Sequence, residues 1–165
     1  MSKKNKRFPE YDLHPHRPKS FKIIDVRNCL AEQLGEGRRR QTFQCTVATD
    51  LVIKKGKGQH GRRANLREYW LWMSLEPEHR PLFCAVWQIW NKGEYILQPK
   101  MDALTDRAKT MIYSLIDEMP EILKSKLCKL HIWGYDSVYQ IPRILDYEHV
   151  ELKDLRDWMP LSVYC

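Results

Sequence analysis

The sequence has no long apolar segment. Among its 165 residues, no apolar run approaches the roughly 20 residues that a helix needs to cross a bilayer. The N-terminal segment 1–20 carries charges but lacks the apolar stretch of a signal peptide. From these absences we expect a cytoplasmic protein that is neither secreted nor bound to a membrane.

Paired cysteines and the usual spacings of metal ligands are absent as well. The five cysteines form no Cys-x-x-Cys pair and cannot all pair with one another, and no two histidines follow a His-x-x-x-His spacing. The chain also contains no internal repeat. These absences argue against a disulfide framework, a zinc site and a repeat architecture.

Apolar and aromatic residues, in contrast, are abundant. They make up 43% and 11% of the chain, which is enough apolar surface to build a folded core. A length of 165 residues corresponds to about one domain. We expect a flexible, basic and proline-rich arm over residues 1–20 and a single compact domain over residues 21–165.

Basic residues are concentrated in the first part of the chain. Residues 1–68 contain 17 Lys and Arg against 7 Asp and Glu, whereas residues 69–165 contain 11 against 14. A basic front half favours a polyanionic partner, such as nucleic acid, with a solvated charged loop as the alternative reading. The candidate polyanion-binding residues are Arg38, Arg39, Arg40, Lys55, Lys57, Arg62 and Arg63.

Hydrophobic periodicity predicts alternating groups of strands and helices. Period-two alternation predicts strands over Thr42–Val47, Leu51–Lys54, Phe83–Trp90, Glu94–Gln98, Val138–Ile141 and Arg143–Leu145. Helical periodicity predicts helices over Arg62–Leu75, over Ala103–Leu130 with a break before Pro120, and over Val150–Met159. We expect loops over Lys55–Gly61 and His131–Asp136. This order predicts an α+β domain with an antiparallel sheet.

Six tryptophans are available to this fold. We expect Trp70, Trp72, Trp87 and Trp90 to pack in the core and on the sheet. Trp133 and Trp158 are the expected exposed pair.

Three features follow one another in an order that suits nucleotide chemistry. Two close glycines, Gly35 and Gly37, precede the first predicted hairpin, Lys54 lies on its second strand, and Glu68 lies on the following helix. Glycines let backbone amides approach phosphate oxygens, a strand lysine reaches those phosphates, and a helix carboxylate holds the ammonium group.

This order resembles the protein-kinase-like domains, in particular the small kinase-like proteins of bacteria and their phages. The resemblance runs from about Leu34 to Glu148 and includes a hinge-like segment at Ile96–Met101. It implies a kinase-like N-lobe, which is an antiparallel sheet plus one helix, and a strongly truncated C-lobe. It also implies ATP and magnesium as cofactors, with Gly35, Gly37, Lys54 and Glu68 at the nucleotide and Asp146 at the metal.

The chain departs from this family at catalytic positions. Arg40 stands where the third glycine of the loop is expected, and Lys129 and Gly134 stand where the family has a catalytic aspartate and asparagine. Asp136 is a substitute carboxylate, but two residues along a loop is several ångströms, beyond the tolerance of a general base. The 19 residues after Asp146 are also too few for the family's activation segment.

We therefore expect a kinase-like pseudoenzyme that acts as a regulatory or inhibitory binding protein on a host macromolecule. The expected target is a host protein, and the expected setting is a phage protein in the cytoplasm of its host bacterium. The first alternative is a basic, non-enzymatic nucleic-acid-binding or anti-defence protein. The second is a minimal active ATP-dependent protein kinase with Asp136 as its base, and the third is another type of enzyme built on His131, Asp136 and Asp146.

Overall fold

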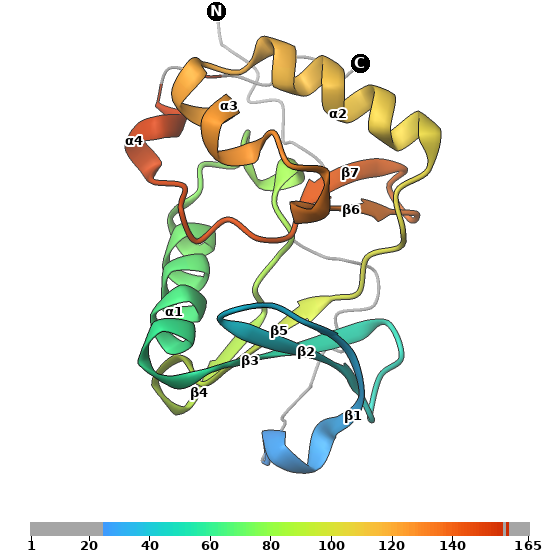
Figure 1. The fold of residues 1–165 in the computed structure, drawn as a ribbon, viewed down its shortest axis with the longest axis vertical. Coiled ribbons are helices and arrows are strands. Elements are labelled where there is room, and N and C mark those ends of the chain that lie inside the picture. The colour runs from blue at the N-terminus through green and yellow to red at the C-terminus, as the bar shows by residue number, and fades with distance from the viewer. Residues whose placement is uncertain (1–24, 157, 159–165) are drawn as a thin grey trace, which may run out of the picture.

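The computed structural model describes residues 25–156 and residue 158. The arm expected at residues 1–20 lies outside the described residues. Within the described part, the chain forms the α+β fold with an antiparallel sheet that the sequence predicts (Figure 1).

A five-stranded antiparallel sheet forms the first half of the fold. Its strands lie in the order β1-β2-β3-β5-β4. The register places Lys54 of β3 opposite Thr42 of β2 and opposite Ile96 of β5, so Lys54 lies on the central strand. The strands are β1 (Leu30–Glu36), β2 (Arg40–Cys45), β3 (Leu51–Gly56), β4 (Gln88–Trp90) and β5 (Tyr95–Pro99), and the turn η1 (Val26–Cys29) precedes them.

Helix α1 (Gly58–Ser74) connects β3 to β4 and packs against the sheet. A helical half follows, which lies above the sheet in Figure 1. It contains α2 (Asp106–Glu118), α3 (Glu121–Leu127), β6 (Trp133–Asp136), β7 (Ile141–Ile144) and α4 (Leu152–Leu155). Short turns lie in the connections: η2 (Arg80–Leu82) follows α1, η3 (Asn91–Gly93) joins β4 to β5, and η4 (Leu130–Ile132) precedes β6. We call β1–β5 with α1 the sheet half, and α2–α4 with β6 and β7 the helical half.

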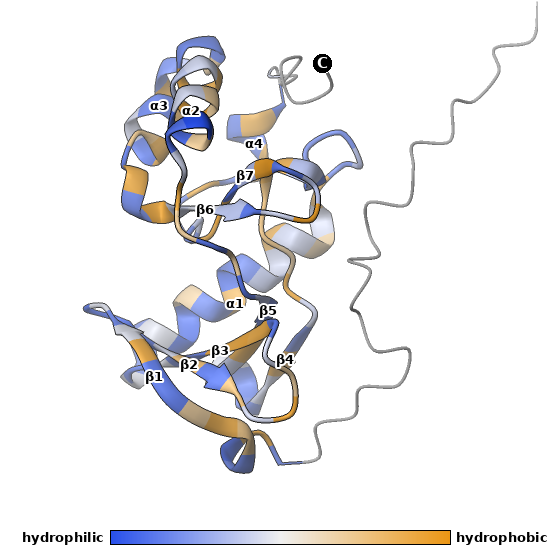
Figure 2. Ribbon diagram, turned by 90° about the vertical axis from the view of Figure 1, so that its right-hand side faces the viewer, coloured by the Kyte–Doolittle hydropathy of each residue, from blue (hydrophilic) through white to orange (hydrophobic). Residues whose placement is uncertain are grey.

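Two hydrophobic cores follow from the alternation of side chains along the strands. Leu51 and Ile53 of β3 join a core on one face of the sheet, together with Val26 and Cys29 of η1. Lys54 therefore points to the opposite face, toward α1 and the helical half. The larger core lies on that side and combines residues of α1, β5 and the helical half. Figure 2 shows the hydrophobic residues along β3 and a mixed distribution along α1.

The predicted hairpin over Thr42–Val47 and Leu51–Lys54 is confirmed by the pairing of β2 with β3. The long predicted helix over Ala103–Leu130 is confirmed as α2 and α3, with the break at Pro120. The side chain of Thr105 accepts a hydrogen bond from the Ala108 amide and so caps the N-terminus of α2.

Both predicted loops are wrong. In Lys55–Gly61, β3 continues to Gly56 and α1 already begins at Gly58, because Gly61 allows the first turn of the helix to pack against backbone. In His131–Asp136, the last four residues form β6, which pairs with residues 141–144. That pairing places residues 138–140 of the strand predicted at Val138–Ile141 in a turn, and Ile141 begins β7.

Other predicted boundaries shift because tertiary pairing sets them. Only Gln88–Trp90 of the strand predicted at Phe83–Trp90 pairs with β5, while Phe83 forms an isolated bridge with Ile144. The terminal helix contains only Leu152–Leu155 of the predicted range within the described residues.

The prediction for the tryptophans is wrong for three of the six. Trp70 is 62% exposed, whereas Trp133 and Trp158 are buried. The face of α1 that packs inward carries Gly61, Ala64, Asn65, Glu68 and Leu71 instead. No helix in the described ranges is long and apolar enough to span a bilayer.

Candidate functional site

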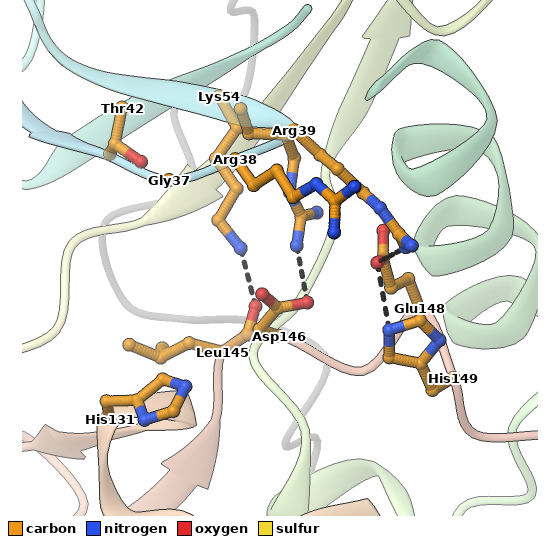
Figure 3. Close-up of a pocket in the computed structure, with 11 residues that line it drawn as sticks. Gly37, Arg38, Arg39, Thr42, Lys54, His131, Leu145, Asp146, Glu148 and His149 are labelled. Carbon is orange, nitrogen blue, oxygen red and sulfur yellow. Dashed lines mark hydrogen bonds and ion pairs between the residues drawn. The ribbon is translucent and has the colours of Figure 1, made fainter. Parts of the chain in front are cut away.

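A pocket of about 400 Å³ lies between the sheet half and the helical half. Cationic side chains dominate its wall, and two carboxylates lie at its floor (Figure 3). The lining residues are Gly37, Arg38, Arg39, Arg40, Thr42, Lys54, His131, Leu145, Asp146, Glu148 and His149.

Lys54 and Glu68 meet at the inner side of this pocket. The Lys54 ammonium lies 3.5 Å from a carboxylate oxygen of Glu68, and Glu68 is completely buried. The same ammonium donates a hydrogen bond of 2.5 Å to the Leu145 carbonyl of the helical half. Asn65 fixes α1 to the sheet, since its side-chain amide donates to the carbonyls of Lys54 and Gly93. The structure thus brings together the strand lysine and helix glutamate that the sequence singled out.

Arg40 lies between the two carboxylates of the site. Its guanidinium contacts Glu68 at 2.7 Å and Asp146 at 2.5 Å, and the arginine is nine-tenths buried. Burial alone raises the pKa of Asp146, but the nearby charges of Arg40 and Lys54 outweigh it and hold that pKa below its ordinary value. Burial likewise lowers the pKa of Arg40, and Glu68 and Asp146 raise it by more. Both groups are therefore charged at neutral pH.

A second ion pair joins the same two segments. Arg39 pairs with Glu148, and His149 lies 3.1 Å from the same Glu148 oxygen. Between these pairs, the Tyr147 amide donates to Glu68 and its hydroxyl donates to the Cys84 carbonyl. Two arginines, Arg39 just before β2 and Arg40 at its start, consequently hold this strand against residues 146–148. Figure 3 shows the contact of Arg39 with Glu148.

Asp136 has a structural role away from the pocket. One of its oxygens accepts hydrogen bonds from the amides of Val138 and Tyr139, and the other accepts from Arg143 at 2.6 Å. Arg143 also donates to the Pro81 carbonyl. Asp136 therefore closes the β6–β7 turn, and it is not among the residues that line the pocket. The structure brings His131 and Asp146 to one pocket and leaves Asp136 outside it.

The predicted phosphate-binding glycines are not sterically required where they stand. A side chain at Gly35 would meet no atom within 4 Å, and one at Gly37 would meet only the Arg40 carbonyl at 3.9 Å. Gly37 does line the pocket and donates to that carbonyl at 2.8 Å, which forms the turn. The close backbone approach occurs instead between Gly56 and Gly61, where added Cβ atoms would clash with backbone.

Of the seven candidate polyanion-binding residues, Arg38, Arg39 and Arg40 line the pocket, and the other four are not among its lining residues. Lys57 lies beside the three arginines, since its ammonium donates a hydrogen bond to the Gly37 carbonyl. Lys57 pairs with Glu36, Arg62 lies 3.8 Å from Glu94, and Lys55 is a half-buried strand residue whose neighbour in sequence, Lys54, points to the opposite face. Much of the basic charge is thus neutralised within the chain.

Sequence reasoning missed several residues of the pocket, namely Thr42, Leu145, Glu148 and His149. Glu148 could have been predicted from the sequence, since it lies two residues after Asp146 and therefore on the same short segment. Among the described residues, no three or more histidine, cysteine, aspartate or glutamate side chains lie together so that they could hold a metal ion. In comparisons with known proteins, no family model and no curated protein matches the chain.

Proposed function

We propose that this protein is a kinase-like pseudoenzyme, a binding protein that regulates or inhibits another macromolecule and transfers no phosphate. The pairing of Arg40 with Asp146 is the observation that supports this proposal. Arg40 holds a permanent positive charge beside the carboxylate that would bind a magnesium ion in an active relative. A divalent cation at Asp146 would lie against a buried guanidinium, and like charges at that distance repel strongly. These residues do not fit magnesium.

The surroundings of the pocket support the same proposal. Lys129 and Gly134 stand at the places of the expected catalytic aspartate and asparagine, and Asp136 is engaged in the β6–β7 turn. A phosphoryl transfer relies on positioning and on charge neutralisation by metal ions and cations. Here the cations Arg39, Arg40 and Lys54 already contact carboxylates or carbonyls of the protein itself. They stabilise the contact between the two halves.

Our first prediction concerns the response to magnesium-ATP. We expect the wild-type protein to transfer no labelled phosphate from magnesium-ATP to itself or to casein. Its melting temperature should rise by less than about 1 °C at magnesium-ATP concentrations that would saturate a typical nucleotide site, because a ligand raises the melting temperature only if it binds the folded state. Lys54→Met is the matched control and should behave like the wild type in both assays.

A second variant isolates the effect of Arg40. Arg40→Gly restores the glycine of the family pattern and frees Asp146, so magnesium-ATP should raise the melting temperature of this variant by about 3 °C, still without phosphate transfer. Adding Lys54→Met to Arg40→Gly should remove that rise. Phosphate transfer by the wild type that Lys54→Met abolishes would overturn the proposal.

A further inference from the structure

The outer side of α1 carries an unusual combination of side chains. Successive residues of a helix are separated by about 100°, so Trp70 and Met73 lie opposite the inward-packed face that contains Asn65 and Glu68. Trp70 is 62% exposed and Met73 is 54% exposed. An exposed helix face is normally polar. Large apolar residues that gather on such a face therefore indicate a contact site.

Two arginines flank these apolar residues. Arg63 and Arg67 precede Trp70 by seven and three positions, which places all three along one side of the helix. Both arginines are exposed, and neither forms an ion pair with a carboxylate among the described residues, in contrast to Arg62, which lies near Glu94. Their charges are available to a partner.

Trp70 also contacts a neighbouring aromatic ring. The centroid of its ring lies 5.4 Å from the centroid of the Tyr69 ring, in an edge-to-face arrangement. In Figure 1, α1 lies at the left edge of the described part of the molecule, where a partner can approach it.

We propose that Arg63, Arg67, Trp70 and Met73 form a docking surface for an acidic protein segment. Tryptophan, methionine and arginine are enriched in the centres of protein interfaces, and tryptophan and arginine dominate their binding energy. The partner places apolar or aromatic side chains over Trp70 and Met73 and carboxylates opposite the two arginines. Nucleic acid fits less well, because two arginines neutralise only two phosphates, whereas tight phosphate-backbone binding uses about six or more.

This inference deepens the proposed function, since it names the surface and the chemistry of the macromolecular partner. The same helix carries Glu68 on its inner side, so a partner on α1 would bind next to the element that holds Lys54 and Arg40. The test below contains no ATP. Its failure therefore leaves the prediction on phosphate transfer unaffected, and the reverse also holds.

The test measures binding of a fluorescein-labelled random copolymer of glutamate and tyrosine by fluorescence anisotropy. This probe offers both carboxylates and aromatic rings. Two double variants test the surface: one combines Trp70→Ser with Met73→Ser, and the other combines Arg63→Glu with Arg67→Glu. We expect each of them to weaken binding by about tenfold or more. The matched controls are Val47→Ser, at another exposed apolar residue, and Arg107→Glu, at an exposed cation of α2, and both should stay within about twofold of the wild type.

Two further probes separate the alternatives. Polyglutamate supplies charge without aromatic rings and should bind more weakly than the copolymer by about tenfold. Equal binding of both polymers, or α1 variants that bind like the controls, would show that the surface is not a specific site. The third probe, oligo(dT), competes with the labelled copolymer. If oligo(dT) displaces the copolymer at a lower concentration than polyglutamate does, and if the α1 variants lose this displacement, the proposal is overturned in favour of a nucleic-acid site.

Discussion

Arg40 illustrates how one side chain changes the electrostatics of a site. Burying an arginine costs several kcal/mol unless its charge is paired and its hydrogen-bond donors are satisfied. Here Glu68 and Asp146 pair with its charge at 2.7 and 2.5 Å, and Arg40 donates a hydrogen bond to Asp146, while its Nη1 has no hydrogen-bond partner among the described residues. Under the proposed function, the carboxylate expected at a metal instead stabilises a buried cation.

This pairing predicts how stability depends on pH through Asp146. Its pKa in the folded protein lies below the ordinary value, because Arg40 and Lys54 outweigh the effect of burial. A depressed carboxylate pKa adds stability above the pKa of the unfolded chain, and this contribution disappears as the pH falls through the folded pKa. Asp146→Asn should therefore lower the free energy of unfolding at pH 7 by about 1 kcal/mol, a small amount because the side chain is half exposed and water screens it.

Urea unfolding of the wild type and Asp146→Asn at a series of pH values checks this expectation. The difference between the two proteins should be constant near neutrality and should shrink below about pH 4. Asp117→Asn is a suitable control, because Asp117 is exposed on α2 and forms no ion pair among the described residues. A difference that grows on acidification would contradict the assignment.

At the level of elements, the junction of β3 and α1 determines where the cationic residues lie. Gly56 and Gly61 approach each other so closely that α1 packs onto the start of β2. The Lys57 amide donates to the Arg39 carbonyl at 2.8 Å, and the Gly61 amide donates to the Lys57 carbonyl. These contacts fix the backbone from which Arg39 and Arg40 reach across the pocket.

We expect Gly61→Ala to destabilise the protein by about 2 kcal/mol, even though alanine is the better helix former. The added Cβ would lie 2.7 Å from the Gly56 carbonyl carbon and closer still to the Arg39 carbonyl oxygen, so backbone must move. Gly35→Ala is the matched control, because a Cβ there meets no atom within 4 Å, and it should change stability by less than about 0.5 kcal/mol. Thermal unfolding of both variants measures the two values, and equal stability would refute the steric argument.

The same junction shows which elements could be predicted from the sequence. The strands around Phe43 and Ile53 were predictable, because alternation is a local pattern that burial on one face enforces. The start of α1 was not, because Gly58 and Gly61 suit a loop by composition, and the close packing of Gly61 against Gly56 depends on the folded structure. Strand β6 was missed for a related reason, since it is paired with residues five to eleven positions later in the chain.

The candidate site was predictable in its residue types and in the contact between Lys54 and Glu68, but not in its other contacts. The spacing of Lys54, Glu68 and Asp146 resembles a nucleotide site, and the structure does bring them together. The ion pairs of Arg40 could not be inferred, because they depend on the side chain crossing from β2 to the segment after β7. From the sequence, Asp136 looked available as a catalytic base, because its ion pair with Arg143 forms only when the β6–β7 hairpin brings the two residues together.

At the level of the whole molecule, a small number of polar contacts joins the two halves. The sheet half has its own core around Ile53, and the larger core extends from α1 into the helical half. Glu68 lies at the boundary, where it contacts Lys54 and Arg40 and accepts a hydrogen bond from the Tyr147 amide at 3.2 Å. A buried carboxylate with three partners in different segments makes folding of the two halves interdependent.

Replacing Glu68 tests this interdependence. Glu68→Gln leaves the buried cations Lys54 and Arg40 with one negative charge fewer, and removing one partner of a buried ion pair is costly. We expect the free energy of unfolding to fall by about 3 kcal/mol. The control Glu76→Gln, at an exposed glutamate just after α1, should change it by less than about 0.5 kcal/mol. Urea unfolding followed by far-UV circular dichroism and by tryptophan fluorescence should give coincident curves for the wild type, because the halves unfold together. Separate transitions in the wild type, or a Glu68→Gln variant as stable as the control, would mean that hydrophobic packing alone joins the two halves.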